Sequence, residues 1–105
     1  MSDAIDRLFA TIAARKGCDP SQSYTAKLLA AGVEKCAKKF GEEATETVIA
    51  AIQRDKTELA KESADVLYHL LVLWAASGIT PEDVYTVLKA REAMSGLEEK
   101  ASRKN

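Results

Sequence analysis

Apolar residues recur along the chain at the three- and four-residue spacing of amphipathic helices, and no stretch shows the sustained alternation of a strand. Glycine and proline are rare and fall where helices would end. The expected helices cover residues 2–16, 23–31, 33–54, 55–77 and 81–94. The pattern therefore predicts an all-α fold, a helical bundle of about five helices in one domain over 1–94. The charged stretch 95–105 has no apolar stripe, and we expect it to be a frayed tail.

Capping residues support these boundaries. Ser23 or Thr25 can cap the second helix, and Gly78 can end the fourth. The stretch Thr80-Pro81-Glu82-Asp83 combines an N-cap threonine, a proline at the first helical position and a carboxylate three residues after the cap. This combination predicts the start of the fifth helix.

The composition is that of one ordinary globular domain. The chain has 105 residues, of which 47% are hydrophobic and 30% charged. A chain of this length hides only about two-thirds of its unfolded surface. We therefore expect a modest core, completed by oligomerisation into a homodimer or a higher homo-oligomer. Fifteen basic and sixteen acidic residues give a net charge of −1, so no overall field favours nucleic acid or an anionic membrane.

Other features favour a cytoplasmic location. Cys18 and Cys36 form no CxxC pair, and free thiols suit a reducing compartment. With one histidine, a zinc site would lack most of its usual ligands. The amino-terminal residues do not show the pattern of a signal peptide. The longest apolar stretch, 66–76, is far shorter than the ~20 residues of a membrane span, and we expect it to be a buried helix.

Acidic residues interrupt the fourth predicted helix where it becomes apolar. At about 100° per residue, Glu58, Glu62, Asp65 and His69 form one polar stripe. Asp65 lies at the entrance of the apolar stretch, where burial of an unpaired carboxylate would be costly. We therefore expect it to be buried beside a cation. A single histidine on such a face is more typical of core packing than of a metal ligand.

The third predicted helix carries a matching group of carboxylates. Glu42, Glu43 and Glu46 crowd into one and a half turns, and the Glu43–Glu46 spacing repeats that of Glu62 and Asp65. Two antiparallel helices with such pairs can bring four carboxylates together, and oxygen ligands in that number suit Mg²⁺ or Mn²⁺. Salt bridges to neighbouring lysines explain any one of these residues better than a metal ion does, but they do not explain the whole set. A di-iron site is excluded, because it needs Glu-x-x-His on two helices.

Three segments carry a resemblance to a known family. They are Ser-Tyr-Thr-Ala-Lys-Leu-Leu at 23–29, the lysines and Gly-Glu-Glu-Ala-x-Glu within 35–46, and Glu-x-Ala-Asp followed by Tyr-His-Leu-Leu within 62–73. Together they resemble the phosphoribosyl-ATP pyrophosphohydrolase family, within the MazG-like superfamily of all-α nucleoside triphosphate pyrophosphohydrolases. The resemblance extends over most of residues 5–95.

The resemblance implies an activity and a ligand set. The activity would be Mg²⁺-dependent hydrolysis of phosphoribosyl-ATP to phosphoribosyl-AMP and pyrophosphate, the second step of L-histidine biosynthesis, by a stand-alone enzyme. Manganese would be able to replace magnesium. The implied metal ligands are Glu43, Glu46, Glu62 and Asp65. Glu42 would be an extra ligand or the base that deprotonates water, and Glu43 is the second candidate for a catalytic role.

Phosphate-binding groups are expected beside the carboxylates. Lys35 and Lys39 share the acidic stripe of the third helix, and Lys38 lies next to it. Basic and hydroxyl groups near the second helix could read the second ribose phosphate that distinguishes phosphoribosyl-ATP from ATP. The expected substrate-binding residues are Ser23, Thr25, Lys27, Lys35, Lys38 and Lys39.

Two other functions remain open at this point. A house-cleaning pyrophosphohydrolase would perform the same chemistry on ordinary or damaged nucleoside triphosphates and deoxynucleoside triphosphates. A non-catalytic helical module would use the acidic cluster only to bind a cation or a basic partner. Release of pyrophosphate separates the module from the enzymes, and substrate preference separates the two enzymes.

Overall fold

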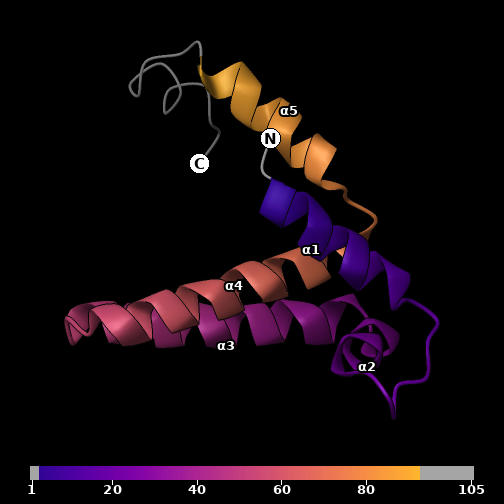
Figure 1. The fold of residues 1–105 in the computed structure, drawn as a ribbon, viewed down its shortest axis with the longest axis horizontal. Coiled ribbons are helices and arrows are strands. Elements are labelled where there is room, and N and C mark those ends of the chain that lie inside the picture. The colour runs from indigo at the N-terminus through magenta and orange to yellow at the C-terminus, as the bar shows by residue number, and fades with distance from the viewer. Residues whose placement is uncertain (1–2, 93–105) are drawn as a thin grey trace.

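The computed structural model describes residues 3–92, which form five α-helices without a strand (Figure 1). Each predicted segment corresponds to one helix, so the all-α prediction is confirmed. The end of the fifth predicted helix at 93–94 and the predicted tail at 95–105 lie outside the described residues. The helices are α1 (Asp3–Ala14), α2 (Tyr24–Ala31), α3 (Val33–Ile52), α4 (Lys56–Ser77) and α5 (Pro81–Glu92).

The predicted caps set most of the helix boundaries. Ser23, rather than Thr25, caps α2, because its hydroxyl accepts a hydrogen bond from the backbone N–H of Ala26 at 3.1 Å. Gly78 ends α4 in the left-handed conformation, with φ 78°. At the start of α5, the backbone N–H of Thr80 donates to Asp83 Oδ2 at 2.9 Å, and the N–H of Asp83 donates to Thr80 Oγ1 at 3.3 Å. This reciprocal pair is a capping box.

Helices α3 and α4 form an antiparallel hairpin that runs along the length of the molecule (Figure 1). Helix α3 ends at Ile52, two residues before the predicted end, because Arg54 turns the chain with φ 59°. Asp55 then caps α4 by accepting from the N–H of Glu58 at 3.0 Å. The tight turn fixes the register of the two helices, and this register decides which of their side chains meet.

The buried core lies at one end of the hairpin, where α1 and α2 pack against α3 and the second half of α4. The prediction that this half of α4 is buried is right for Leu71 and Val72, which have no exposed surface. It is wrong for Leu67, which is 44% exposed because its side of the hairpin remains open. The core cluster consists of Ile12, Leu28, Cys36, Leu71 and Val72.

Helix α5 turns away from α4 by 110° and packs mainly against α1. The hydroxyl of Tyr85 donates a hydrogen bond to Asp6 Oδ1 at 3.0 Å, which joins the two helices. Among the described helices, none is by itself both long and apolar enough to cross a membrane. Helices α4 and α5 meet that criterion only when they are taken as a bent pair.

Candidate metal centre and phosphate cleft

Three carboxylates converge between α3 and α4. Glu43 of α3 and the pair Glu62 and Asp65 of α4 each place one oxygen within 4.8 Å of the others. A donor set made only of carboxylate oxygens fits Mg²⁺ or Mn²⁺ better than zinc. Asp65 is exposed, so the prediction that it is buried is wrong. The reason is that this side of the hairpin faces solvent, which leaves the cluster accessible to a large substrate.

The fourth predicted ligand, Glu46, lies beside this group. A hydrogen-bonding contact with the Glu46 carboxyl group, partial burial, and the charges of Glu46, Asp65 and Glu62 raise the pKa of Glu43 to about 7. Burial, followed by the charges of Glu46 and its other acidic neighbours, also raises the pKa of Glu62. The four carboxylates therefore repel one another in the absence of a cation, and a bound divalent ion would relieve this repulsion.

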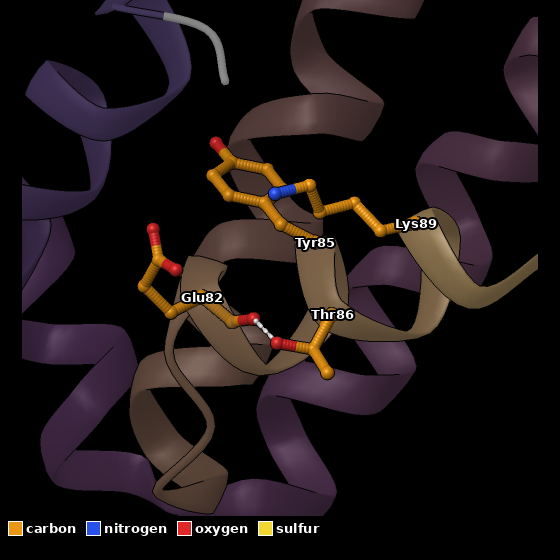
Figure 2. Close-up of a pocket in the computed structure, with 4 residues that line it drawn as sticks. All are labelled: Glu82, Tyr85, Thr86 and Lys89. Carbon is orange, nitrogen blue, oxygen red and sulfur yellow. Dashed lines mark hydrogen bonds between the residues drawn. The ribbon is translucent and has the colours of Figure 1, made fainter. Parts of the chain in front are cut away.

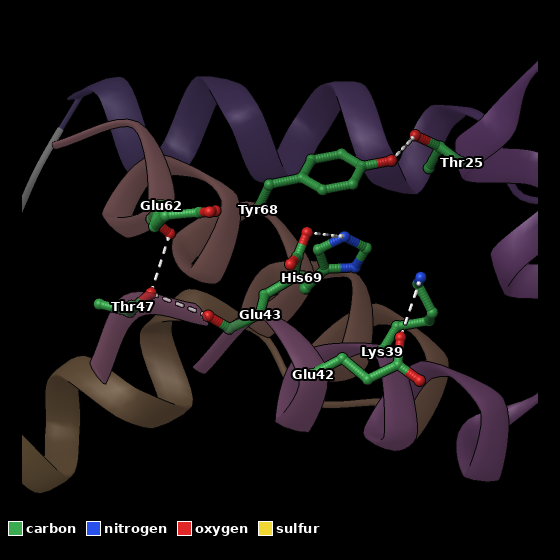
Figure 3. Close-up of polar contacts among 8 residues, drawn as sticks. All are labelled: Thr25, Lys39, Glu42, Glu43, Thr47, Glu62, Tyr68 and His69. Carbon is green, nitrogen blue, oxygen red and sulfur yellow. Dashed lines mark hydrogen bonds and ion pairs between the residues drawn. The ribbon is translucent and has the colours of Figure 1, made fainter. Parts of the chain in front are cut away.

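Thr47 ties the two acidic helices together at the cluster (Figure 3). Its hydroxyl lies 2.8 Å from the carbonyl oxygen of Glu43 and 3.3 Å from that of Glu62, and it can donate to both. Both hydrogen bonds involve the backbone of a residue whose side chain belongs to the cluster. Thr47 was not among the residues predicted for the site, although its position four residues after Glu43 places it on the same face of α3.

His69 fills the space behind the cluster. It is 5% exposed, and its Nε2 lies 3.9 Å from Glu43 Oε1. Burial and the nearby charge of Lys39 lower the pKa of His69, which keeps the ring neutral at neutral pH. Its ring packs edge-on against Tyr68 and Tyr24, with centroid distances of 5.0 and 6.3 Å. The interpretation as a core histidine agrees with this burial.

Glu42 differs from its neighbour in the sequence. Lys39 Nζ donates to Glu42 Oε1 at 3.1 Å, and Glu42 is not one of the three convergent carboxylates (Figure 3). The hydrogen bond and the charge of Lys39 lower the pKa of Glu42. A carboxylate with a lowered pKa is a poor base at neutral pH. In this geometry, Glu42 therefore forms a salt bridge with Lys39.

A basic cleft of about 250 Å³ lies between α2 and α3. Three of the four predicted lysines line it, whereas Lys38 is exposed and lies outside its lining. Lys39 connects the cleft to the cluster, because it lines the cleft and its charge also interacts with that of Glu43. The lining residues are Tyr24, Lys27, Leu28, Ala31, Lys35 and Lys39.

The two predicted hydroxyl groups of α2 have partners within the protein. Ser23 caps the helix, and Thr25 Oγ1 shares a hydrogen bond with the hydroxyl of Tyr68 (Figure 3). These contacts position α2 against α4 and therefore place Lys27 and Tyr24 at the cleft. Neither hydroxyl lines the cleft.

A second hollow, of about 290 Å³, adjoins the cluster on its other side. It is lined by Glu46 and Glu62 together with residues towards the end of the hairpin. The cluster therefore has the basic cleft of α2 and α3 on one side and an acidic hollow of α3 and α4 on the other. The remaining lining residues are Ile49, Ala50, Gln53 and Glu58.

Comparison with known proteins identifies the family. The family model described as "Phosphoribosyl-ATP pyrophosphohydrolase" matches residues 5–92. A phosphoribosyl-ATP pyrophosphatase of Parvibaculum lavamentivorans is 63% identical over 94% of this chain and 91% of its own. Proteins with the same name from Cereibacter sphaeroides and Paracoccus denitrificans are each 60% identical, over 94% and 95% of this chain and 96% and 93% of their own. The chain therefore belongs to the phosphoribosyl-ATP pyrophosphohydrolase family.

Proposed function

We propose that the carboxylate cluster of α3 and α4 is the centre at which this chain hydrolyses phosphoribosyl-ATP to phosphoribosyl-AMP and pyrophosphate, in histidine biosynthesis. The activity follows from membership of the family and from about 60% identity over nearly the whole chain. The placement rests on one observation, the convergence of Glu43, Glu62 and Asp65 within 4.8 Å.

The residues present fit a magnesium ion, with manganese as a substitute. Glu43, Glu62 and Asp65 would hold it, and Glu46 is close enough to Glu43 to complete the set. A bound ion of this kind supplies charge neutralisation at phosphate oxygens and makes a water molecule more acidic. The exposed position of Asp65 leaves one side of the cluster open to phosphate oxygens and water.

Side chains of the protein would transfer the proton of the attacking water and bind the phosphate groups. We assign the proton of the attacking water to a carboxylate oxygen of Glu43 that the ion does not engage. Glu42 orients Lys39, which can bind a phosphate group beside the cluster. Lys35 adds a second cation to the same cleft. Lys38 is exposed outside the cleft and adds only to the local positive charge.

Lys27 is the group that we assign to the second ribose phosphate. It lines the cleft from α2, on the opposite wall from the lysines of α3. Ser23 and Thr25, which were predicted to share this role, act through the placement of α2, because both hydroxyls have partners within the protein. Tyr24 lies at the same cleft and offers an aromatic surface to a base or ribose.

Self-association and a cytoplasmic location belong to the same proposal. The small buried core supports assembly into a homodimer or a higher homo-oligomer, because several large apolar side chains of the described residues remain exposed, among them Val48, Ile49 and Ile52. The thiols of Cys18 and Cys36 are both free, which suits a reducing compartment.

Pyrophosphate release from phosphoribosyl-ATP, ATP and dATP tests the proposed substrate. We expect the wild-type protein with magnesium to prefer phosphoribosyl-ATP by at least a factor of ten in kcat/KM, or about 1.4 kcal/mol. Equal rates with all three nucleotides would instead support a house-cleaning enzyme. No release from any of them would leave only a module that binds a cation or a partner.

A further inference from the structure

His69 has a buried nitrogen without a partner. The residue is 5% exposed, and its Nδ1 makes no hydrogen bond to any group in the part of the chain that the structure describes. A buried polar atom left unpaired lowers stability, whereas a leucine would fill a similar space without this cost. Packing of the core alone therefore does not account for a histidine at this position.

The ring continues the acidic stripe of α4 into the interior. Asp65 lies four residues before His69, and Glu62 three residues before Asp65, so the three side chains share one face of the helix. The other ring nitrogen, Nε2, lies 3.9 Å from Glu43 Oε1 on α3. Figure 3 shows the imidazole between the Glu43 carboxylate and the side chain of Lys39. His69 therefore lies between the acidic cluster and the basic cleft.

Two tyrosines fix the plane of the ring. Tyr68 and Tyr24 pack edge-on against it, with interplanar angles of 79° and 87°. The hydroxyl of Tyr68 is itself held by a hydrogen bond with Thr25 (Figure 3). A buried ring with these contacts has little freedom to rotate, so the direction in which Nε2 points is fixed.

The surroundings of the ring select its tautomer. Burial and the charge of Lys39 lower the pKa of His69, so the ring is neutral and carries one N–H. The Glu43 carboxylate favours this proton on Nε2, which leaves Nδ1 as the acceptor. The separation of 3.9 Å is longer than a hydrogen bond, and a rotation of the Glu43 side chain can close it. A carboxylate has about four lone-pair positions, so an N–H at one of them leaves room for an ion and for the proton of water.

We propose that His69 is a positioning residue for Glu43, whose carboxylate it holds towards Glu62 and Asp65 by directing its Nε2–H at Oε1. This inference rests on the proposed function, because the orientation of Glu43 matters only if the cluster holds an ion. His69 itself contacts neither the ion nor the substrate. Groups that orient a metal ligand in this way typically change metal affinity by about ten- to a hundredfold.

Magnesium affinity, measured by calorimetry, tests the role of the Nε2–H. His69→Leu removes both nitrogens and should weaken binding by about tenfold or more. His69→Gln keeps an N–H donor near the position of Nε2 and should restore most of the affinity. In EDTA, the Tm of His69→Leu should be at least that of wild type, because the unpaired nitrogen is gone. Wild-type affinity in His69→Leu, or a glutamine variant no better than the leucine variant, would overturn the proposal.

Tyr85 supplies the matched control, because it is also a buried side chain with a polar group. It is 7% exposed, lines a hollow of about 310 Å³ on α5 (Figure 2), and donates its hydrogen bond to Asp6, outside the cluster. Tyr85→Phe should lower the Tm and leave the magnesium affinity unchanged, the reverse of the pattern for His69→Leu. If Tyr85→Phe weakens magnesium binding as much as His69→Leu does, the loss reflects general destabilisation and the proposal fails.

The chain contains one histidine, which gives a second test without any substitution. In untagged protein labelled with ¹⁵N-histidine, the nitrogen shifts of the ring at pH 8 report which nitrogen carries the proton. We expect the proton on Nε2, and a shift of this signal as magnesium is added. A proton on Nδ1, or an Nε2 signal that magnesium leaves unchanged while calorimetry shows binding, would overturn only the role of His69. A wild-type protein that binds no magnesium would overturn this role together with the proposed metal centre.

Discussion

Glu42 and Glu43 show how strongly the surroundings of a residue decide its chemistry. Lys39 lowers the pKa of Glu42, whereas the contact with Glu46, burial and the nearby negative charges raise the pKa of Glu43 to about 7. The two residues are adjacent in the chain, but a helix turns them about 100° apart. One carboxylate therefore holds a cation of the protein, and the other is available for a metal ion and a proton.

Replacement of Asp65 by asparagine tests the ligand role of a single residue. Asp65→Asn keeps the shape of the side chain and removes its charge, so the cluster loses one anionic ligand. We expect kcat/KM to fall by about a hundredfold or more, with unchanged helical content by circular dichroism. Glu34→Gln, an exposed residue in the first turn of α3, is the control and should keep the wild-type rate. Near-normal turnover of Asp65→Asn would rule out the proposed site.

Lys27→Ala tests whether Lys27 binds the second ribose phosphate. We expect kcat/KM for phosphoribosyl-ATP to fall by roughly tenfold or more, about 1.4 kcal/mol, because an anion contact is lost. Residual hydrolysis of ATP should change much less. Lys38→Ala removes a lysine that lies outside the cleft and should affect both substrates little. If Lys27→Ala lowers both activities in parallel, Lys27 serves the triphosphate and the selectivity lies elsewhere.

At the residue scale, the sequence predicted the acidic set but not the orientation of its members. The i, i+3 spacing on two helices indicated that four carboxylates would meet, and three of them, Glu43, Glu62 and Asp65, lie within 4.8 Å of one another. The exposure of Asp65 depends on which side of the hairpin the other helices cover. The spacing of the acidic residues along the chain does not tell which side that is. Thr47 was missed because a threonine within a helix gives no signal that its hydroxyl reaches a second helix.

The α3–α4 hairpin is the element on which the site depends. Its register brings residues 43, 62 and 65 to one level, and Thr47 joins the two backbones at that level. Its ends could be predicted closely, because Asp55 and Gly78 have the residue types that cap helices. The partial exposure of its second half could not be predicted. An apolar run has the same sequence pattern whether the rest of its own chain or another copy covers it.

Thr47→Val tests whether the link between the two helices tunes the metal site. Valine keeps the branched shape but loses the hydroxyl, so the carbonyl oxygen of Glu62 loses a hydrogen bond from the opposite helix. We expect magnesium affinity, measured by calorimetry, to fall by about tenfold, in the range typical of residues that support metal ligands. Thr45→Val is the matched control, since the hydroxyl of Thr45 donates only within α3, to Gly41. Equal affinities of the two variants would contradict the role of Thr47.

At the scale of the whole molecule, the cluster links stability to pH and to magnesium. The raised pKa of Glu43 means that the folded state holds this proton more tightly than the unfolded state does. Between the ordinary value of 4.5 and about 7, deprotonation therefore lowers the free energy of unfolding as the pH rises. The lowered pKa of His69 acts in the opposite direction below its ordinary value of 6.5. The contribution of Glu43 is therefore isolated by comparison with a variant.

Thermal melts in EDTA and in millimolar magnesium test this link. Without metal, the wild-type Tm should fall relative to that of Glu43→Gln as the pH rises from 5 to 8, by roughly 5 °C. Magnesium should raise the wild-type Tm, and more strongly at pH 8 than at pH 5, because binding requires the deprotonated carboxylate. In Glu43→Gln, magnesium should raise the Tm only slightly at either pH. Identical wild-type curves with and without magnesium would show that no preformed site exists.

The assembly is the part that the sequence specified least. The chain length predicted a core in need of completion by a second copy, and this expectation stays a prediction. Helix α5 turns one face towards α1 and the opposite face to solvent, and residue spacing alone does not give this arrangement.

The position of a bound ion tests the central claim most directly. Crystals of the wild-type protein grown with manganese should give an anomalous difference peak enclosed by the carboxylates of Glu43, Glu62 and Asp65, with Glu46 beside it. The peak should disappear in Asp65→Asn crystals grown in the same way. Manganese peaks elsewhere in wild type, with none at this cluster, would contradict the account.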